Sequence, residues 1–161
     1  MKWLIGGVVV AMFGVACGGS EGPPVDRVDE AEKDIECSSF TLRFEEFYGF
    51  CYEDCLGKLV VSSDGSATAA RADYLGQPET TRDFTLTAEE LVAVRSALQT
   101  GISQPWDAQY GCPDCYDQGR YSLVYESCGQ PQTTLVDPEK QPETLQPLFA
   151  KLRDLLRANE P

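Results

Sequence analysis

Histidine is absent from this chain of 161 residues. Its absence removes the commonest general base and the commonest metal-binding side chain. The serines therefore have no histidine partner, and the chain contains neither a Gly-x-Ser-x-Gly motif nor a Gly-rich phosphate-binding loop. These absences favour a protein that is not an enzyme and that uses no cofactor and no metal.

Basic residues are scarce as well. The chain has 13 lysines and arginines against 26 aspartates and glutamates, which gives a net charge of −13. A surface of this sign repels phosphate backbones, so we expect no nucleic-acid partner. The simplest interpretation of the acidic excess is that it keeps the protein soluble.

The chain has no apolar run long enough to span a membrane, which takes about 20 residues. The longest run extends from Trp3 to Ala16, after the positive charge of Lys2. Small residues, from Gly14 onward, lie directly before Cys17. A short positive region, an apolar run and small residues are typical of a cleaved signal peptide, so we assign residues 1–16 to one.

The end of this segment, Val15-Ala16-Cys17, resembles the lipobox of bacterial lipoproteins, although Gly14 stands where an aliphatic residue is usual. The resemblance implies cleavage before Cys17, lipidation of its sulfur and amine, and a membrane partner reached through the lipid anchor. Glycines follow at positions 18 and 19, without an acidic inner-membrane retention signal. The resemblance therefore implies a lipid-anchored protein of the cell envelope, at the outer membrane.

A tether follows the lipidated cysteine. Residues 17–34 consist largely of glycine, proline and charged residues and are almost without apolar side chains. This composition cannot bury enough surface to fold and predicts a flexible linker. We therefore expect a single disulfide-rich domain over residues 35–161.

Two periodicities predict the elements of this domain. Alternating apolar residues indicate strands, and apolar residues three or four apart indicate amphipathic helices. Asp64-Gly65 is a strong hairpin signal, and Thr87 with Glu90 has the spacing of a capping box. Strands are predicted at 39–47, 58–63, 66–75, 82–86, 120–127 and 132–137, and helices at 87–101 and 144–159.

The short hairpins favour an α+β fold, with an antiparallel sheet of about five to six strands and two amphipathic helices packed on one face. In this layout, and in the segments FCYEDC and DGSAT, residues 37–158 resemble a family of uncharacterised, cysteine-containing domains of bacterial lipoproteins. The family has no known activity, so the resemblance implies the fold and the lipid anchor only.

The cysteines after Cys17 suggest disulfides, because an exported domain meets an oxidising compartment. Cys51 with Cys55 and Cys112 with Cys115 are local pairs in loops, which leaves Cys37 with Cys128 by elimination. In the alternative, the cysteines of the two loops pair with each other and staple the loops together, which would stabilise the fold more.

Two chemical alternatives use the same cysteines. Cys112 and Cys115 form a CxxC motif, which serves thiol-disulfide oxidoreductases when a helix terminus favours the thiolate. Asp114 and Asp117 oppose a thiolate, and no helix is predicted there. A zinc site built from both loops would need four reduced thiols. An oxidising compartment disfavours reduced thiols.

Aromatic residues gather in the two cysteine loops. They either shield the disulfides against the sheet edge or form a binding surface built by both loops at one end of the sheet. The neighbouring carboxylates Glu45 and Glu46 are expected to be solvated charges, with a bulge or strand end close by. The candidate binding residues are Phe47, Tyr48, Phe50, Tyr52, Trp106, Tyr110 and Tyr116.

These observations favour a non-enzymatic binding or structural domain, anchored by lipid in the envelope, with an unknown envelope protein as a candidate partner. An oxidoreductase using Cys112 and Cys115 is one alternative. A module resembling protease inhibitors is another, because small disulfide-stapled domains with rigid loops can serve that role.

Overall fold

The computed structural model describes residues 39–49, 51, 55–74, 76–113, 115 and 118–161. These residues belong to one compact unit, Glu36–Pro161. Cys17, Cys37, Phe50, Tyr52 and Tyr116 lie outside the described residues, so the predictions made for them stay predictions.

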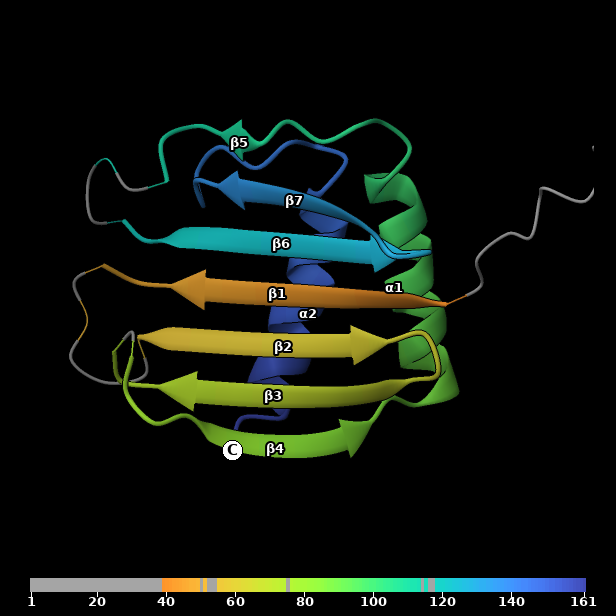
Figure 1. The fold of residues 1–161 in the computed structure, drawn as a ribbon, viewed down its shortest axis with the longest axis horizontal. Helices are drawn as coiled ribbons and strands as arrows, with labels where there is room; N and C mark the ends of the chain where they lie inside the picture. Colours follow the sequence, from red (N-terminus) through yellow and green to blue (C-terminus); the bar gives the residue numbers. More distant parts are fainter. Residues whose placement is uncertain (1–38, 50, 52–54, 75, 114, 116–117) are drawn as a thin grey trace, which may run out of the picture. The chain divides into compact units, whose positions relative to one another are not determined.

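A mostly antiparallel sheet in the order β4-β3-β2-β1-β6-β7-β5 forms one layer of the domain (Figure 1). The central strand β1 pairs with β2 on one side and with β6 on the other. Only β5 and β7 run parallel. The strands are β1 (Phe40–Phe47), β2 (Leu56–Ser62), β3 (Ser66–Ala72), β4 (Thr80–Thr85), β5 (Gln109–Tyr110), β6 (Arg120–Ser127) and β7 (Gln130–Val136).

The α+β prediction is confirmed, but the expected five to six strands are too few, because the described sheet has seven. The added strand is β5, which has only two residues. Its flanks bind β7 through hydrogen bonds from Leu135 N to Ala108 O and from Asp137 N to Tyr110 O. Two residues are too few to show a period, so no sequence pattern marks this strand.

The predicted hairpin turn between β2 and β3 is present. Gly65 has a φ of 89°, which glycine adopts without a steric penalty. The Asp64 carboxylate accepts hydrogen bonds from the backbone N–H and the hydroxyl of Ser66, and these bonds lower the pKa of Asp64. The turn residues thus fix the hairpin locally, as the sequence predicts.

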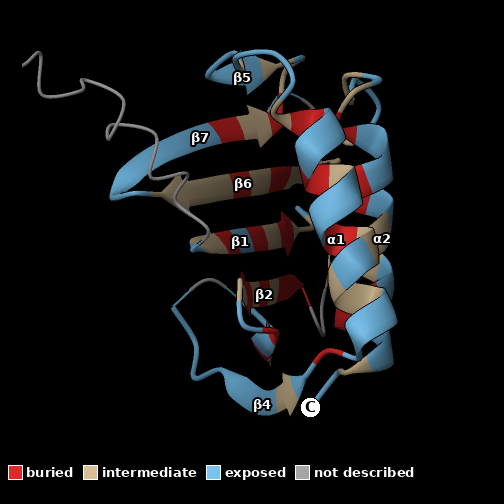
Figure 2. Ribbon diagram, turned by 90° about the vertical axis from the view of Figure 1, so that its right-hand side faces the viewer, coloured by how far each residue is buried: buried red, intermediate tan, exposed pale blue. Residues whose placement is uncertain are grey.

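The two predicted helices are α1 (Ala88–Gly101) and α2 (Gln146–Ala158), and both cover the same face of the sheet (Figure 2). Thr87 and Glu90 form the expected capping box at the start of α1. Hydrogen bonds from the Thr87 backbone and hydroxyl lower the pKa of Glu90. No helix in the described part of the chain is long and apolar enough to span a membrane.

The core lies between the helices and the sheet. Leu42 and Phe44 of β1 are fully buried and point toward the helices. Phe44, Tyr121 and Phe149 form an aromatic cluster with ring centroids 5.5 to 6.0 Å apart. The opposite face of the sheet carries no helix among the described residues (Figure 2).

Candidate functional site

The two cysteine loops lie at the same end of the sheet. Phe47 at the end of β1 pairs with Leu56 at the start of β2 and with Arg120 at the start of β6. The start of β2 and the start of β6, into which the two loops lead, therefore lie on either side of the end of β1 (Figure 1). This arrangement agrees with the expectation that both loops share one end of the sheet.

The described cysteines form disulfides. Cys51 is bonded to Cys55 and Cys112 to Cys115, with Cα–Cα distances of 5.4 Å in both pairs. These are the two predicted local pairs, so the alternative pairing between the loops is wrong. Cys128 is also disulfide-bonded, but its predicted partner Cys37 lies outside the described residues.

Three of the described aromatic residues of the predicted surface lie at this end of the sheet. Phe47 and Tyr48 are half-buried at this end of the sheet, and Arg120 lies over the Phe47 ring at 5.6 Å. Tyr110 of β5 lies at the same end, because it pairs with Val136 of β7, and Val136 pairs with Tyr121 near the start of β6. Its side chain is half-buried.

Trp106 does not join this surface. Its ring packs against Tyr125 at 6.3 Å, and its indole N–H donates to Gly101 O at the end of α1. Tyr125 pairs with Leu42, five residues before Phe47 in β1, which is roughly 17 Å along the strand. Trp106 therefore supports the core near α1, and the part of the prediction that placed it in a binding surface is wrong.

Glu46 is buried, with 1% of its surface exposed, and the expectation of a solvated charge is wrong. The pairing of β1 with β2 continues without a bulge through Glu46 to Phe47. The side chain therefore follows the inward alternation of Leu42 and Phe44 and points toward the helices. That alternation was visible in the sequence and could have revealed this position.

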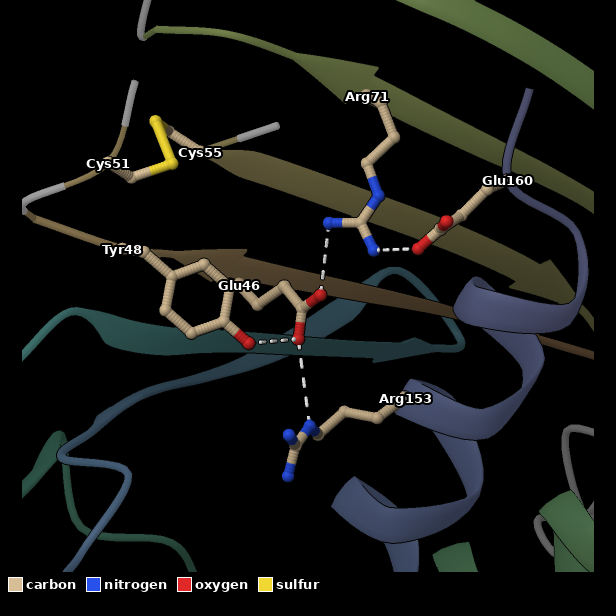
Figure 3. A network of polar contacts seen from close by, with 7 residues as sticks. All are labelled: Glu46, Tyr48, Cys51, Cys55, Arg71, Arg153 and Glu160. Carbon is tan, nitrogen blue, oxygen red and sulfur yellow. Dashed lines mark hydrogen bonds and ion pairs between the residues drawn. A yellow bond between two sulfur atoms is a disulfide. The ribbon is translucent and has the colours of Figure 1, made fainter. Parts of the chain in front are cut away.

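Three side chains meet the Glu46 carboxylate: one from β3, one from α2 and one from just after β1 (Figure 3). Arg71 of β3 approaches with Nη1 at 3.1 Å, and Arg153 of α2 with Nε at 3.6 Å. The Tyr48 hydroxyl donates a hydrogen bond of 3.2 Å to Oε2. A second carboxylate, that of Glu160 after α2, pairs with Nη2 of Arg71. This ion network joins the sheet to α2.

Gly57 makes room for the network. It lies between Glu46 and Arg71 in the register of β1, β2 and β3. A Cβ atom placed on Gly57 would lie 2.5 Å from Nη1 of Arg71 and 2.8 Å from Cδ2 of Leu156. A glycine at this position lets the arginine cross one strand and reach the carboxylate on the next.

We therefore expect Gly57→Ala to lower the free energy of unfolding by about 2 kcal/mol, because the added methyl displaces Arg71 and overpacks Leu156. Urea denaturation followed by circular dichroism measures this change. Ala70→Gly is the matched control, because it removes a methyl group from the neighbouring strand outside the network. A Gly57→Ala protein as stable as the wild type would contradict the role given to Gly57.

Tyr121 lies under the guanidinium of Arg153, which is 5.5 Å from the ring centre. Burial raises the pKa of Tyr121, so the phenol stays uncharged at neutral pH. The ring then offers a neutral π-face to the cation, an interaction that adds to the ion pair with Glu46.

The network holds a buried carboxylate between two guanidinium groups. Glu46 is enclosed and already meets two guanidinium groups, so it is not accessible to a substrate. Solvent reaches the network only at its rim, which is formed by the side chains of Arg71 and Arg153. These side chains are 11% and 29% exposed. Among the described residues, no group of three or more cysteines and carboxylates is arranged to bind a metal.

The surroundings of the CxxC motif do not favour a reactive thiolate. The backbone N–H of Cys112 donates to Oδ2 of Asp137 at 3.5 Å, and Asp137 is only 5% exposed. This contact places a carboxylate beside the backbone of the motif, and negative charge near a cysteine is the opposite of the surroundings that reactive thiolates use. Among the described residues, the element that follows the motif is strand β6, and no helix begins at the motif.

Comparisons with known proteins add no relative to this picture. No protein-family model matches the chain, and no curated protein matches it in sequence.

Proposed function

We propose that this chain is a lipid-anchored protein of the cell envelope, whose folded part is a non-enzymatic binding domain. The observation that carries the proposal is the sequence Val15-Ala16-Cys17 at the end of the apolar run, followed by a tether rich in glycine, proline and charge. Lipid on Cys17 would hold the domain at the outer membrane, and the tether would let it reach a partner there.

The physical logic of the anchor supports this proposal. Each buried methylene group contributes about 0.8 kcal/mol, and stable anchoring takes more than one acyl chain. A diacylglycerol on the sulfur and an acyl group on the freed amine of Cys17 would meet that requirement. The disulfides of the domain agree with an oxidising compartment outside the cytoplasm.

The binding part of the proposal concerns the end of the sheet that carries the cysteine loops. Two disulfides brace this end, and half-buried Phe47 and Tyr48 lie beside the rim of the ion network. Loops held on a rigid scaffold commonly carry recognition. We therefore place the binding surface of the domain at this end.

The anchor is tested by replacing Cys17 with serine. We expect this variant to lose all incorporation of an alkyne-labelled palmitate and to leave the membrane fraction, because serine offers no sulfur for lipidation. In-gel fluorescence measures the label, and density-gradient fractionation measures the location.

The matched control is Ser20→Ala, a change in the same segment that leaves the cysteine in place. This control should keep both the label and the outer-membrane location. Equal labelling of the Cys17→Ser variant and the wild type would overturn the proposed anchor. Labelled protein that collects in the inner-membrane fraction would overturn the outer-membrane location.

A further inference from the structure

One edge of the Arg71 guanidinium has a hydrogen-bond donor without an acceptor among the described residues. Nη1 faces the buried Glu46, while Nη2 meets Oε1 of Glu160 (Figure 3). The Nε atom of Arg71 is buried and has no hydrogen-bond partner among the described residues. A buried donor without a partner is costly, so this atom marks a contact that the fold leaves open.

Nε and Nη2 together form the edge of a guanidinium that binds a carboxylate through two parallel hydrogen bonds. Glu160 contacts this edge through Nη2 and leaves Nε without a bond. A carboxylate that approached the edge squarely would satisfy both donors. The buried Glu46 on the opposite side fixes the position of the guanidinium and thus prepares the edge for such a ligand.

Glu160 is placed so that it can be displaced. It lies beyond the last residue of α2, Ala158, and its side chain is 46% exposed. Beside it is a surface hollow of about 170 Å³, lined by Arg71, Asp73, Pro78, Thr80 and Glu160 among others. The hollow gives a second carboxylate a path to the arginine.

We propose that Arg71 is a carboxylate-binding site, which Glu160 occupies from within the chain until a carboxylate of a ligand replaces it. The proposal deepens the proposed function, on which it rests, by naming the class of group that the binding domain recognises. A ligand carboxylate that takes the place of Glu160 keeps one carboxylate on Nη2 of Arg71, so the contact between Arg71 and Glu46 need not change.

The test is chemical rescue of Glu160→Gln in the full chain. We expect this variant to melt a few degrees below the wild type, and we expect sodium acetate to restore the loss when sodium chloride at equal ionic strength does not. A ligand at about three times its dissociation constant raises the Tm of a domain of this size by about 3 °C. The wild type should respond at least threefold less, because Glu160 competes for the site.

The matched control is Glu126→Gln, which breaks the exposed ion pair with Arg43, 3.9 Å long, on another part of the sheet. Acetate should give this variant no more stabilisation than it gives the wild type. A second readout is the Arg71 Nε–H signal in ¹H–¹⁵N spectra, assigned by its loss in Arg71→Lys. The signal should move when acetate is added to the Glu160→Gln protein.

Two further probes separate the sources of the carboxylate. Acetate alone reports a free small anion, and the peptide acetyl-Gly-Glu-Gly-amide reports an acidic side chain of a protein partner. Tighter binding of the peptide would assign the site to a protein, and equal binding would assign it to a small carboxylate.

If acetate stabilises Glu160→Gln no more than it stabilises Glu126→Gln, and the Arg71 signal does not move, then Glu160 only fastens the end of α2 and the inference is wrong. That outcome would leave the lipid anchor untouched. Conversely, a Cys17→Ser protein that kept its label would overturn the anchor without affecting the anion site.

Discussion

Replacing Glu46 with glutamine is expected to lower the free energy of unfolding by about 3 kcal/mol, because two guanidinium groups would lose their shared countercharge. Removing one partner of a buried ion pair costs about 3–5 kcal/mol. The lower value applies here, because the side chain of Arg153 is 29% exposed and water can compensate part of its charge. The Tm should fall by roughly 10 °C.

The neighbouring residue supplies the control for this prediction. Glu45 points to the opposite face of the same strand, is 47% exposed and lies 3.9 Å from Lys58. Glu45→Gln should change stability by less than about 0.5 kcal/mol, since exposed ion pairs contribute little. Urea denaturation followed by the fluorescence of Trp106 measures both variants. Equal stability of the two variants would show that Glu46 contributes no more to the free energy of unfolding than a surface charge does.

Replacing Gly119 with alanine should lower the free energy of unfolding by about 3 kcal/mol or more. A Cβ atom at this position would lie 2.1 Å from the carbonyl oxygen of Phe47 and 3.0 Å from Cα of Tyr48, both backbone atoms that cannot rotate away. The φ of 85° adds a conformational cost of about 1–2 kcal/mol for a residue with a side chain. The start of β6 would have to move away from the end of β1.

Gly76 separates the two causes. It has the same φ of 85°, but a Cβ atom there would have no other atom within 4 Å. Gly76→Ala should therefore lower the free energy of unfolding only by the conformational part, about 1–2 kcal/mol. Thermal unfolding of both variants by circular dichroism gives the difference. If Gly119→Ala and Gly76→Ala unfold at the same temperature, the close approach of β1 and β6 does not limit the choice of residue at position 119.

Local patterns predicted most of the elements. The alternation of β1, the turn at Asp64-Gly65 and the capping box at Thr87 each depend on residues that are neighbours in the sequence. The same holds for the disulfides Cys51–Cys55 and Cys112–Cys115, which close within their own loops. β5 was not predicted, because it has only two residues and these show no sequence pattern. It forms by pairing with β7.

The candidate site was predicted less well. Phe47, Tyr48 and Tyr110 lie at the cysteine-loop end because the strands beside the loops fix their positions, and their role in binding stays a prediction. Trp106 was misplaced, because its position depends on a hydrogen bond to the end of α1 and not on the loop that contains it. The ion network was missed, because Glu46 was interpreted as part of a charged pair and not as the next inward position of its strand.

The sequence alone determined what depends on neighbouring residues, namely the types of most elements and the two local disulfides. Only the tertiary structure decided the surroundings of Glu46. The register of three strands brings Arg71 across Gly57, and the packing of α2 brings Arg153 to the same carboxylate. Such a site depends on distances between segments far apart in the chain, and these distances exist only once the sheet and the helix have packed together.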